Sequence, residues 1–295
     1  MQTRPRNIDV ATRLFRQNGS LFACPLCGMD LQVDEPAALR CGNHHTYDLA
    51  KQGYVNLLTS RVKAGKYNSE LFAARLALHQ TGFFTELLAA LENCIATYAP
   101  RRPQGQLIIL DAGCGEGSHL AHLAARVQAT GQPALGIGLD IAKDGIRLAA
   151  STYTGLIWCV ADLARSPLQA AQCDIILNIL SPANYAEFHR LLRPDGIVVK
   201  VFPGPSYLQE LRTALYAGGN KETYRNEDSV QQFSQQYAPL VTEQVCYQQE
   251  LTITTLDYLL QMTPLAWNAD PTALEAVRRA GLDRITVDAT IMVGR

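Results

Sequence analysis

Apolar residues between positions 107 and 202 fall into short runs separated by amphipathic segments. The runs are nearly continuous in apolar residues, which is typical of strands that are covered on both faces. They lie at 107–111, 134–140, 156–162, 173–180 and 196–202. The intervening segments have the three- and four-residue apolar spacing of helices, at 118–129, 143–153 and 184–192. Strands that alternate with helices in this way predict an α/β fold with a doubly wound parallel sheet.

The flanking regions also contain regular patterns. Helical spacing predicts a short leading helix over 7–17 and a longer helical stretch over 69–98, interrupted near Gly82. The Pro, Arg and Gly residues at 100–106 mark a boundary. The tail is predicted to contain a helix at 206–217, a strand near 241–254, helices at 255–262 and 271–281, and a last strand at 284–293.

Composition narrows the class of protein. With 47% hydrophobic and 18% charged residues, the chain has the balance of an ordinary globular protein. Its longest apolar runs are too short to span a bilayer, and its first residues lack the apolar core of a secretory signal, so we expect a cytoplasmic protein. The first 66 residues carry nine Lys or Arg against five acids, a charge of +4 in a chain of net charge −1. Such a basic front end favours a polyanionic partner.

A glycine-rich turn follows the first predicted strand, in the order Asp111, Gly113, Gly115, Gly117. A turn of this kind between a strand and a helix lets the backbone approach a ligand closely. The dinucleotide fingerprint needs Gly or Ala at position 118, where this chain has Ser118. The spacing therefore favours a different cofactor.

The turn resembles motif I of the class I S-adenosylmethionine-dependent methyltransferases. That resemblance implies a Rossmann-like sheet with an antiparallel last strand. It also implies that Asp111 faces the methionine end of the cofactor, that Asp140 holds the ribose hydroxyls, and that Asp162 and Leu163 meet the adenine. The carboxyl ends of parallel strands share one edge of a sheet, so these acids are expected to converge there.

Four metal-ligand residue types cluster near the N-terminus. Cys24 and Cys27 are followed, after thirteen residues, by Cys41 and His45, a spacing typical of a structural zinc site. His44 is an alternative fourth ligand. A zinc ion with four protein ligands has no open position for chemistry, so its role is structural.

Most of the chain resembles the RlmA-type 23S rRNA (guanine-N1)-methyltransferases, including the TlrB-like branch that confers macrolide resistance. The resemblance rests on the zinc residues, on Lys51-Gln-Gly-Tyr-Val-Asn-Leu-Leu58, on the glycine turn, on Phe202-Pro-Gly-Pro205 and on Leu260-Gln-Met-Thr-Pro264 with Trp267. It implies zinc and S-adenosylmethionine as cofactors and methylation of a guanine in a hairpin loop of domain II of 23S rRNA. It also implies a homodimer.

The sequence also offers candidates for guanine positioning and for RNA binding. Asn178, at the end of the fourth strand, is a candidate for positioning the guanine, although a structural role for it is nearly as well supported. Arg61, Lys63, Lys66 and Trp267 are candidates for RNA binding. No general base is evident in the sequence.

We divide the chain into a helical lead (1–20), a zinc-binding RNA-recognition module (21–60), a helical linker (61–105) and a methyltransferase domain (106–295). Two other functions stay open. One is methylation of another RNA, a protein or a small molecule. The other is a non-catalytic, zinc-bearing RNA-binding protein.

Overall fold

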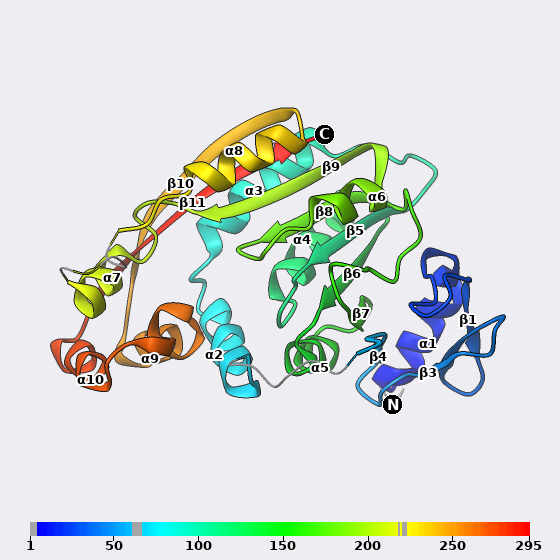
Figure 1. Cartoon of the computed structure of the whole chain (residues 1–295), viewed down its shortest axis with the longest axis horizontal. Helices are drawn as coiled ribbons and strands as arrows, with labels where there is room; N and C mark the ends of the chain where they lie inside the picture. The colour runs from blue at the N-terminus through cyan, green and yellow to red at the C-terminus, as the bar shows by residue number, and fades with distance from the viewer. Residues whose placement is uncertain (1–4, 61–66, 218, 220–222) are drawn as a thin grey trace.

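The computed structural model describes residues 5–60, 67–217, 219 and 223–295. Within these residues a sheet of eight strands forms the centre of the molecule, in the order β10-β11-β9-β8-β5-β6-β7-β4 (Figure 1). Its strands are β4 (Tyr54–Asn56), β5 (Leu107–Ala112), β6 (Ala134–Asp140), β7 (Ile157–Val160), β8 (Cys173–Ile179), β9 (Leu192–Pro203), β10 (Pro239–Glu250) and β11 (Arg284–Gly294). The predicted α/β architecture is confirmed.

The strands from β4 to β9 run parallel, and the last strand does not. β11 pairs antiparallel with β9, and β10 pairs antiparallel with β11, so the predicted antiparallel last strand is confirmed. All residues of β5 and β8 are buried, because helices cover both faces of the sheet. The carboxyl ends of β5, β6 and β8 meet at one edge, where the glycine turn lies.

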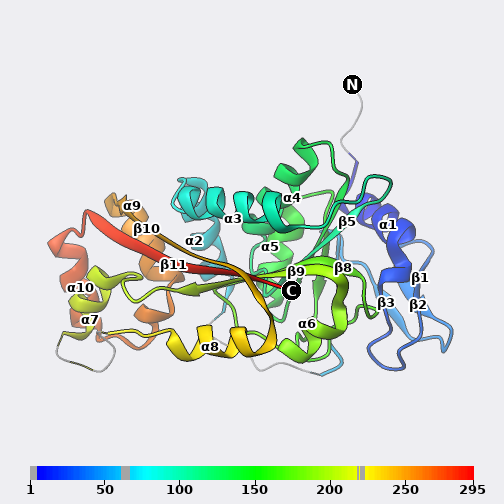
Figure 2. The ribbon, with the colours of Figure 1, turned by 90° about the horizontal axis from the view of Figure 1, so that it is seen from above.

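Two layers of helices pack on the sheet, and a helical lobe extends from one end. Figure 2 shows α3, α4 and α5 on one side of the sheet and α6 and α8 on the other, with α7, α9 and α10 forming the lobe. The helices are α1 (Asn7–Asn18), α2 (Ser69–Gln80), α3 (Thr85–Tyr98), α4 (Ser118–Ala129), α5 (Lys143–Thr152), α6 (Tyr185–Leu191), α7 (Gln209–Tyr216), α8 (Glu227–Gln236), α9 (Ile253–Met262) and α10 (Pro271–Ala280). Two 3-10 turns, η1 (Gly19–Leu21) and η2 (Pro264–Asn268), complete the set. None of the described helices is both long and apolar enough to cross a membrane.

The N-terminal part forms a small antiparallel sheet at the end of the molecule opposite the helical lobe (Figures 1 and 2). Its strands are β1 (Leu31–Asp34), β2 (Ala38–Cys41) and β3 (Thr46–Asp48). The chain then enters the large sheet as β4, which pairs in parallel with β7. Residues 54–56, which the division into ranges assigns to the zinc-binding module, therefore form the edge strand of the large sheet.

Helix α8 is absent from the sequence prediction. Its apolar residues Val230 and Phe233, followed by Tyr237, stand among Gln and Ser, and Phe233 and Tyr237 are buried against the sheet. The residues 69–98, predicted as a helical stretch within the linker 61–105, form α2 and α3. Both pack on the core, α2 against α5 and α9 and α3 against β10 and β11.

Candidate cofactor and metal sites

The glycine turn between β5 and α4 is packed so closely that side chains have no room. Gly113 and Gly117 have φ angles of 89° and 82°. A Cβ on Gly113 would lie 2.0 Å from the Ser181 Oγ, and one on Gly117 would lie 2.4 Å from the ring of Trp158. Only glycine therefore fits both the conformation and the space at these two positions, because the side chains of Ser181 and Trp158 fill it.

Two of the three acids predicted for this site, Asp111 and Asp140, lie at the turn. Asp111 is buried, and burial raises its pKa to about 8, with further contributions from Asp140 and Glu116 against the lowering effect of Arg75. The carboxylate of Asp140 accepts hydrogen bonds from the backbone N–H groups of Gly115 (2.8 Å) and Ala142 (2.7 Å). Asp140 therefore fixes the turn while each of its oxygens keeps a second lone pair.

The adenine-side candidates lie further along the same edge. Asp162 is exposed, and its Oδ1 accepts a hydrogen bond of 2.8 Å from the backbone of Ala164. The side chain of Leu163 lies beside Gly113, 3.8 Å from the position of a Cβ there. The structure thus places Leu163 at the glycine turn, whereas Asp162 faces solvent at the end of β7.

Helix α2 brings a cation to the turn that sequence reasoning missed. Arg75 Nε lies 3.1 Å from Glu116 Oε2, and the Glu116 side chain is almost fully buried. Burial alone would lower the pKa of Arg75, but the nearby carboxylates of Glu116, Asp111 and Asp140 raise it. Arg75 is on the buried face of α2 with Leu71, Phe72 and Leu78. A charged residue on the apolar face of a helix is the one feature of the sequence from which this role could have been predicted.

Two buried imidazoles without a polar partner belong to the same region. Of the six buried side-chain nitrogen or oxygen atoms of the described residues that form no hydrogen bond, Arg75 Nε and Glu116 Oε2 face each other as the ion pair just described, whereas His79 Nε2 and His119 Nε2 have no polar partner. Burial lowers the pKa of His79 to about 4 and that of His119 as well, so both rings are neutral. Buried polar atoms without partners are rare in folded proteins. An amino acid group with an ammonium and a carboxylate fits this combination of acids, guanidinium and neutral imidazoles.

Asn178 lies beneath the strand edge rather than at its surface. It is fully buried, and its Nδ2 donates to the backbone oxygens of Ala112 (2.7 Å) and Pro182 (3.1 Å). Its Oδ1 accepts a hydrogen bond of 2.5 Å from Lys200 Nζ. These bonds use both amide hydrogens, so contact of Asn178 with a guanine stays a prediction that the geometry does not favour.

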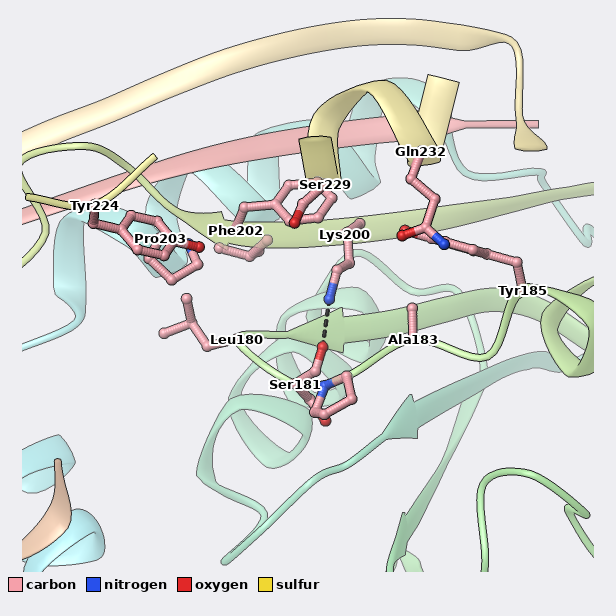
Figure 3. Close-up of a pocket in the computed structure, with 12 residues that line it drawn as sticks. Leu180, Ser181, Ala183, Tyr185, Lys200, Phe202, Pro203, Tyr224, Ser229 and Gln232 are labelled. Atoms are coloured by element: carbon pink, nitrogen blue, oxygen red, sulfur yellow. Dashed lines mark hydrogen bonds between the residues drawn. The ribbon is translucent and has the colours of Figure 1, made fainter. Parts of the chain in front are cut away.

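A cavity of about 330 Å³ opens beside Asn178, between the ends of β8 and β9 and helix α8 (Figure 3). Lys200, Phe202, Tyr224 and Gln232 are among the residues that line it. The cavity shares Ser181 with the wall of the glycine turn, because the Ser181 side chain packs against Gly113.

The four predicted zinc ligands come together. Their ligand atoms lie within 4.8 Å of one another, with Cys27 Sγ 3.6 Å from Cys41 Sγ and His45 Nδ1 3.4 Å from Cys41 Sγ. Zn–S bonds of about 2.3 Å in a tetrahedron require separations of about 3.5 to 3.8 Å. The donor set and its spacing therefore fit zinc.

Local turns and one hydroxyl prepare this cluster. The backbone bonds Gly28 N–H to Cys24 O (2.8 Å) and His44 N–H to Cys41 O (2.9 Å) close the two ligand turns. Burial raises the pKa of the Cys24 thiol, but hydrogen bonds, the largest from the Tyr47 hydroxyl, outweigh it and lower the pKa to about 6. His44 has a φ of 63° and its Nδ1 lies 2.8 Å from Arg40 Nη2, outside the cluster. The geometry thus selects His45 over His44.

Of the predicted RNA-binding residues, Trp267 lies in the part of the chain that the structure describes. Arg61, Lys63 and Lys66 lie outside the described residues. Trp267, in η2, is half-buried, and its ring meets that of Tyr67 edge-on at 4.9 Å. Among the described arginines of the front end, Arg6 pairs with Asp9 and Arg16 with Glu35, which reduces the charge they offer to a polyanion.

Two family models match the chain. Residues 22–66 match the RlmA N-terminal zinc ribbon, and residues 109–196 match a methyltransferase domain. The first match covers the Cys3His cluster, and the second covers the glycine turn and the strand-end acids.

Curated relatives are similar over nearly the whole chain. YxjB of Bacillus subtilis (strain 168), named as a candidate 23S rRNA (guanine-N1)-methyltransferase, is 42% identical over 93% of this chain and 97% of its own length. A protein of Micromonospora griseorubida with the same designation is 34% identical, over 92% and 95%. The 23S rRNA (guanine(748)-N1)-methyltransferase of Streptomyces fradiae is 31% identical, over 92% and 95%. The chain therefore belongs to the family of the 23S rRNA (guanine-N1)-methyltransferases.

Proposed function

We propose that this protein transfers a methyl group from S-adenosylmethionine to N1 of a guanine in 23S rRNA. One observation carries the proposal: relatives with that activity match both the zinc ribbon and the methyltransferase core in a single chain. A small-molecule or protein methyltransferase needs only the second part.

The cofactor supplies a methyl group on a positively charged sulfur. Asp111 would hold its ammonium, and ionisation of this buried acid is favoured when a cation lies beside it. Asp140 would accept the ribose hydroxyls, and Asp162 and Leu163 would border the adenine. Gly113, Gly115 and Gly117 would form the turn on which the cofactor lies, and the first and last must be glycine because a Cβ there would collide with Ser181 or Trp158.

Cys24, Cys27, Cys41 and His45 would hold a structural zinc ion, which fixes the fold of the ribbon. We place the RNA contact on this ribbon, on Arg61, Lys63 and Lys66, and on Trp267. We further propose a homodimer, a cytoplasmic location and a target in a hairpin loop of domain II. A loop nucleotide is favoured because N1 lies on the Watson–Crick edge, which a duplex hides.

The test is methylation of unmodified 23S rRNA with tritiated S-adenosylmethionine, followed by primer extension. N1-methylguanine blocks reverse transcription, so we expect one new stop that depends on enzyme and cofactor. Tritium transfer to RNA without a stop would identify another RNA modification. No transfer to RNA, with transfer to protein or small molecules in a cell extract, would favour the alternative methyltransferase. Cofactor binding without any transfer would favour the non-catalytic RNA-binding protein.

A further inference from the structure

Lys200 is a buried lysine without an anionic partner. Only 4% of it is exposed, and no carboxylate of the described residues forms an ion pair with it. Its Nζ donates to Asn178 Oδ1 and to the backbone oxygen of Ser181, and it lies 5.0 Å from the centre of the Phe202 ring (Figure 3). An ammonium has three N–H donors, so one remains for a ligand in the cavity that Lys200 lines.

The surrounding cavity has the size and the groups that a purine base needs. Its volume of about 330 Å³ exceeds that of a single base. Phe202 and Tyr224 offer aromatic surfaces, and Ser229 and Gln232, both from α8, offer polar groups at the rim. Aromatic surfaces with a few fixed polar groups are how proteins hold an extruded base.

The position also suits methyl transfer. Ser181 separates the cavity from the glycine turn, and Asn178 ties the loop 180–182 to Ala112 at the end of β5. A base in the cavity would lie next to the cofactor turn, on the side of β8 and β9. We propose that this cavity receives the target guanine and that the Lys200 ammonium donates a hydrogen bond to the guanine O6. This inference rests on the proposed function.

A hydrogen-bond donor at O6 would favour this chemistry. Guanine N1 carries a proton at neutral pH, and its loss leaves negative charge shared between N1 and O6. In the proposed step the N1–H proton passes to water, the N1 electron pair bonds to the methyl carbon, and the carbon–sulfur pair stays on the departing thioether. Lys200 neither gains nor loses a proton. Its charge lies on a side chain that is almost fully buried, and it stabilises the developing anion.

The pH profile gives a signature of this role. Burial lowers the pKa of Lys200 to about 8. The titratable groups that share its cavity are Tyr185 from α6 and Tyr224, whose pKa values burial raises, and the neighbour from β11 is the uncharged Met292. The methylation rate should therefore fall above about pH 8, where the ammonium is lost.

The experiment compares Lys200→Met, Lys200→Arg and the exposed-lysine control Lys143→Met in single-turnover methylation of 23S rRNA at saturating RNA. We expect Lys200→Met to lose about a hundredfold in rate, as for removal of an oxyanion donor. Lys200→Arg should recover part of the rate and lose the fall above about pH 8, because arginine stays charged. Lys143→Met should match the wild type.

Thermal unfolding and S-adenosylhomocysteine affinity report whether each variant folds, and Lys200→Arg carries the test if Lys200→Met does not fold. An unchanged rate and pH profile in both Lys200 variants would overturn the inference while leaving the proposed function intact. Weaker RNA binding with an unchanged saturated rate would also overturn it, since the cavity would then hold a neighbouring nucleotide. If the wild type produces no primer-extension stop at a guanine, the proposed function itself is wrong, which is distinct from a failure of the Lys200 inference alone.

Discussion

Asp111 is a carboxylic acid that the fold buries near the end of β5, directly before the glycine turn. Its pKa is raised from 3.8 to about 8, mainly by burial. The unfolded chain loses this proton near pH 4, so the folded protein binds one more proton than the unfolded chain between about pH 4 and pH 8. The stability that Asp111 contributes is therefore complete below pH 4 and is lost as the pH rises through 8.

Replacing Asp111 with Asn should change both the pH dependence of the melting temperature and the affinity for S-adenosylhomocysteine, and the two effects can be measured separately. Without cofactor, the melting temperature of the variant should depend less on pH between about 5 and 8 than that of the wild type, because the buried ionisation is gone. Its affinity for S-adenosylhomocysteine should fall about ten- to a hundredfold, the range for a lost hydrogen bond to a charged group. Calorimetric titration and thermal melts across this pH range measure both. Equal affinity in the two proteins would remove Asp111 from the cofactor site.

The elements of the core were predictable because their pattern is local. Each parallel strand is a run of apolar residues, and Asp111 and Asp140 stand at strand ends where the sheet brings them together. Helix α8 was missed because Val230 and Phe233 are its only large apolar residues, and the segment around them is polar up to Tyr237, which follows the helix. Strand β4 and the role of Arg75 were missed for another reason. Their partners, β7 and the glycine turn, are distant in the chain, so no local pattern encodes the contact.

His44 and His45, in the second ligand turn, allow a matched pair of variants to test the zinc assignment. The sequence left His44 and His45 open, and the structure places only His45 Nδ1 beside Cys24 and Cys41. His45→Ala should therefore reduce bound zinc well below one ion per chain, whereas His44→Ala, which loses only an exposed contact with Arg40, should keep it. Atomic absorption on the purified variants measures the number of zinc ions per chain. Full zinc in His45→Ala with loss in His44→Ala would reverse the assignment.

The zinc ribbon and the methyltransferase core share one hydrophobic cluster. Phe15 and Phe22 from the N-terminal part pack in the same buried group as Leu135 and Ile157 from the large sheet. Asn7 Nδ2 donates to Ala150 O at 3.1 Å, which fastens α1 to α5. Two units joined by a linker would unfold separately, whereas units that share a hydrophobic core and are joined by the pairing of β4 with β7 unfold together.

Removal of zinc should therefore destabilise the whole protein rather than the ribbon alone. Without metal, the four ligands lose their common partner, and the ribbon is expected to unfold. Leu49 and Val55 pack in the shared cluster, and β4 pairs with β7, so this unfolding would also loosen the edge of the large sheet. A loss of about 5 kcal/mol, a fraction of what structural zinc supplies to small zinc domains, would lower the melting temperature by about 10 °C or more. Differential scanning calorimetry with and without a chelator should show one cooperative transition in both cases, shifted downward without zinc. Restoring zinc to the chelated protein is the control. Two transitions, of which the upper one is unchanged by the chelator, would mean that the ribbon folds independently and that β4 adds nothing to the stability of the core.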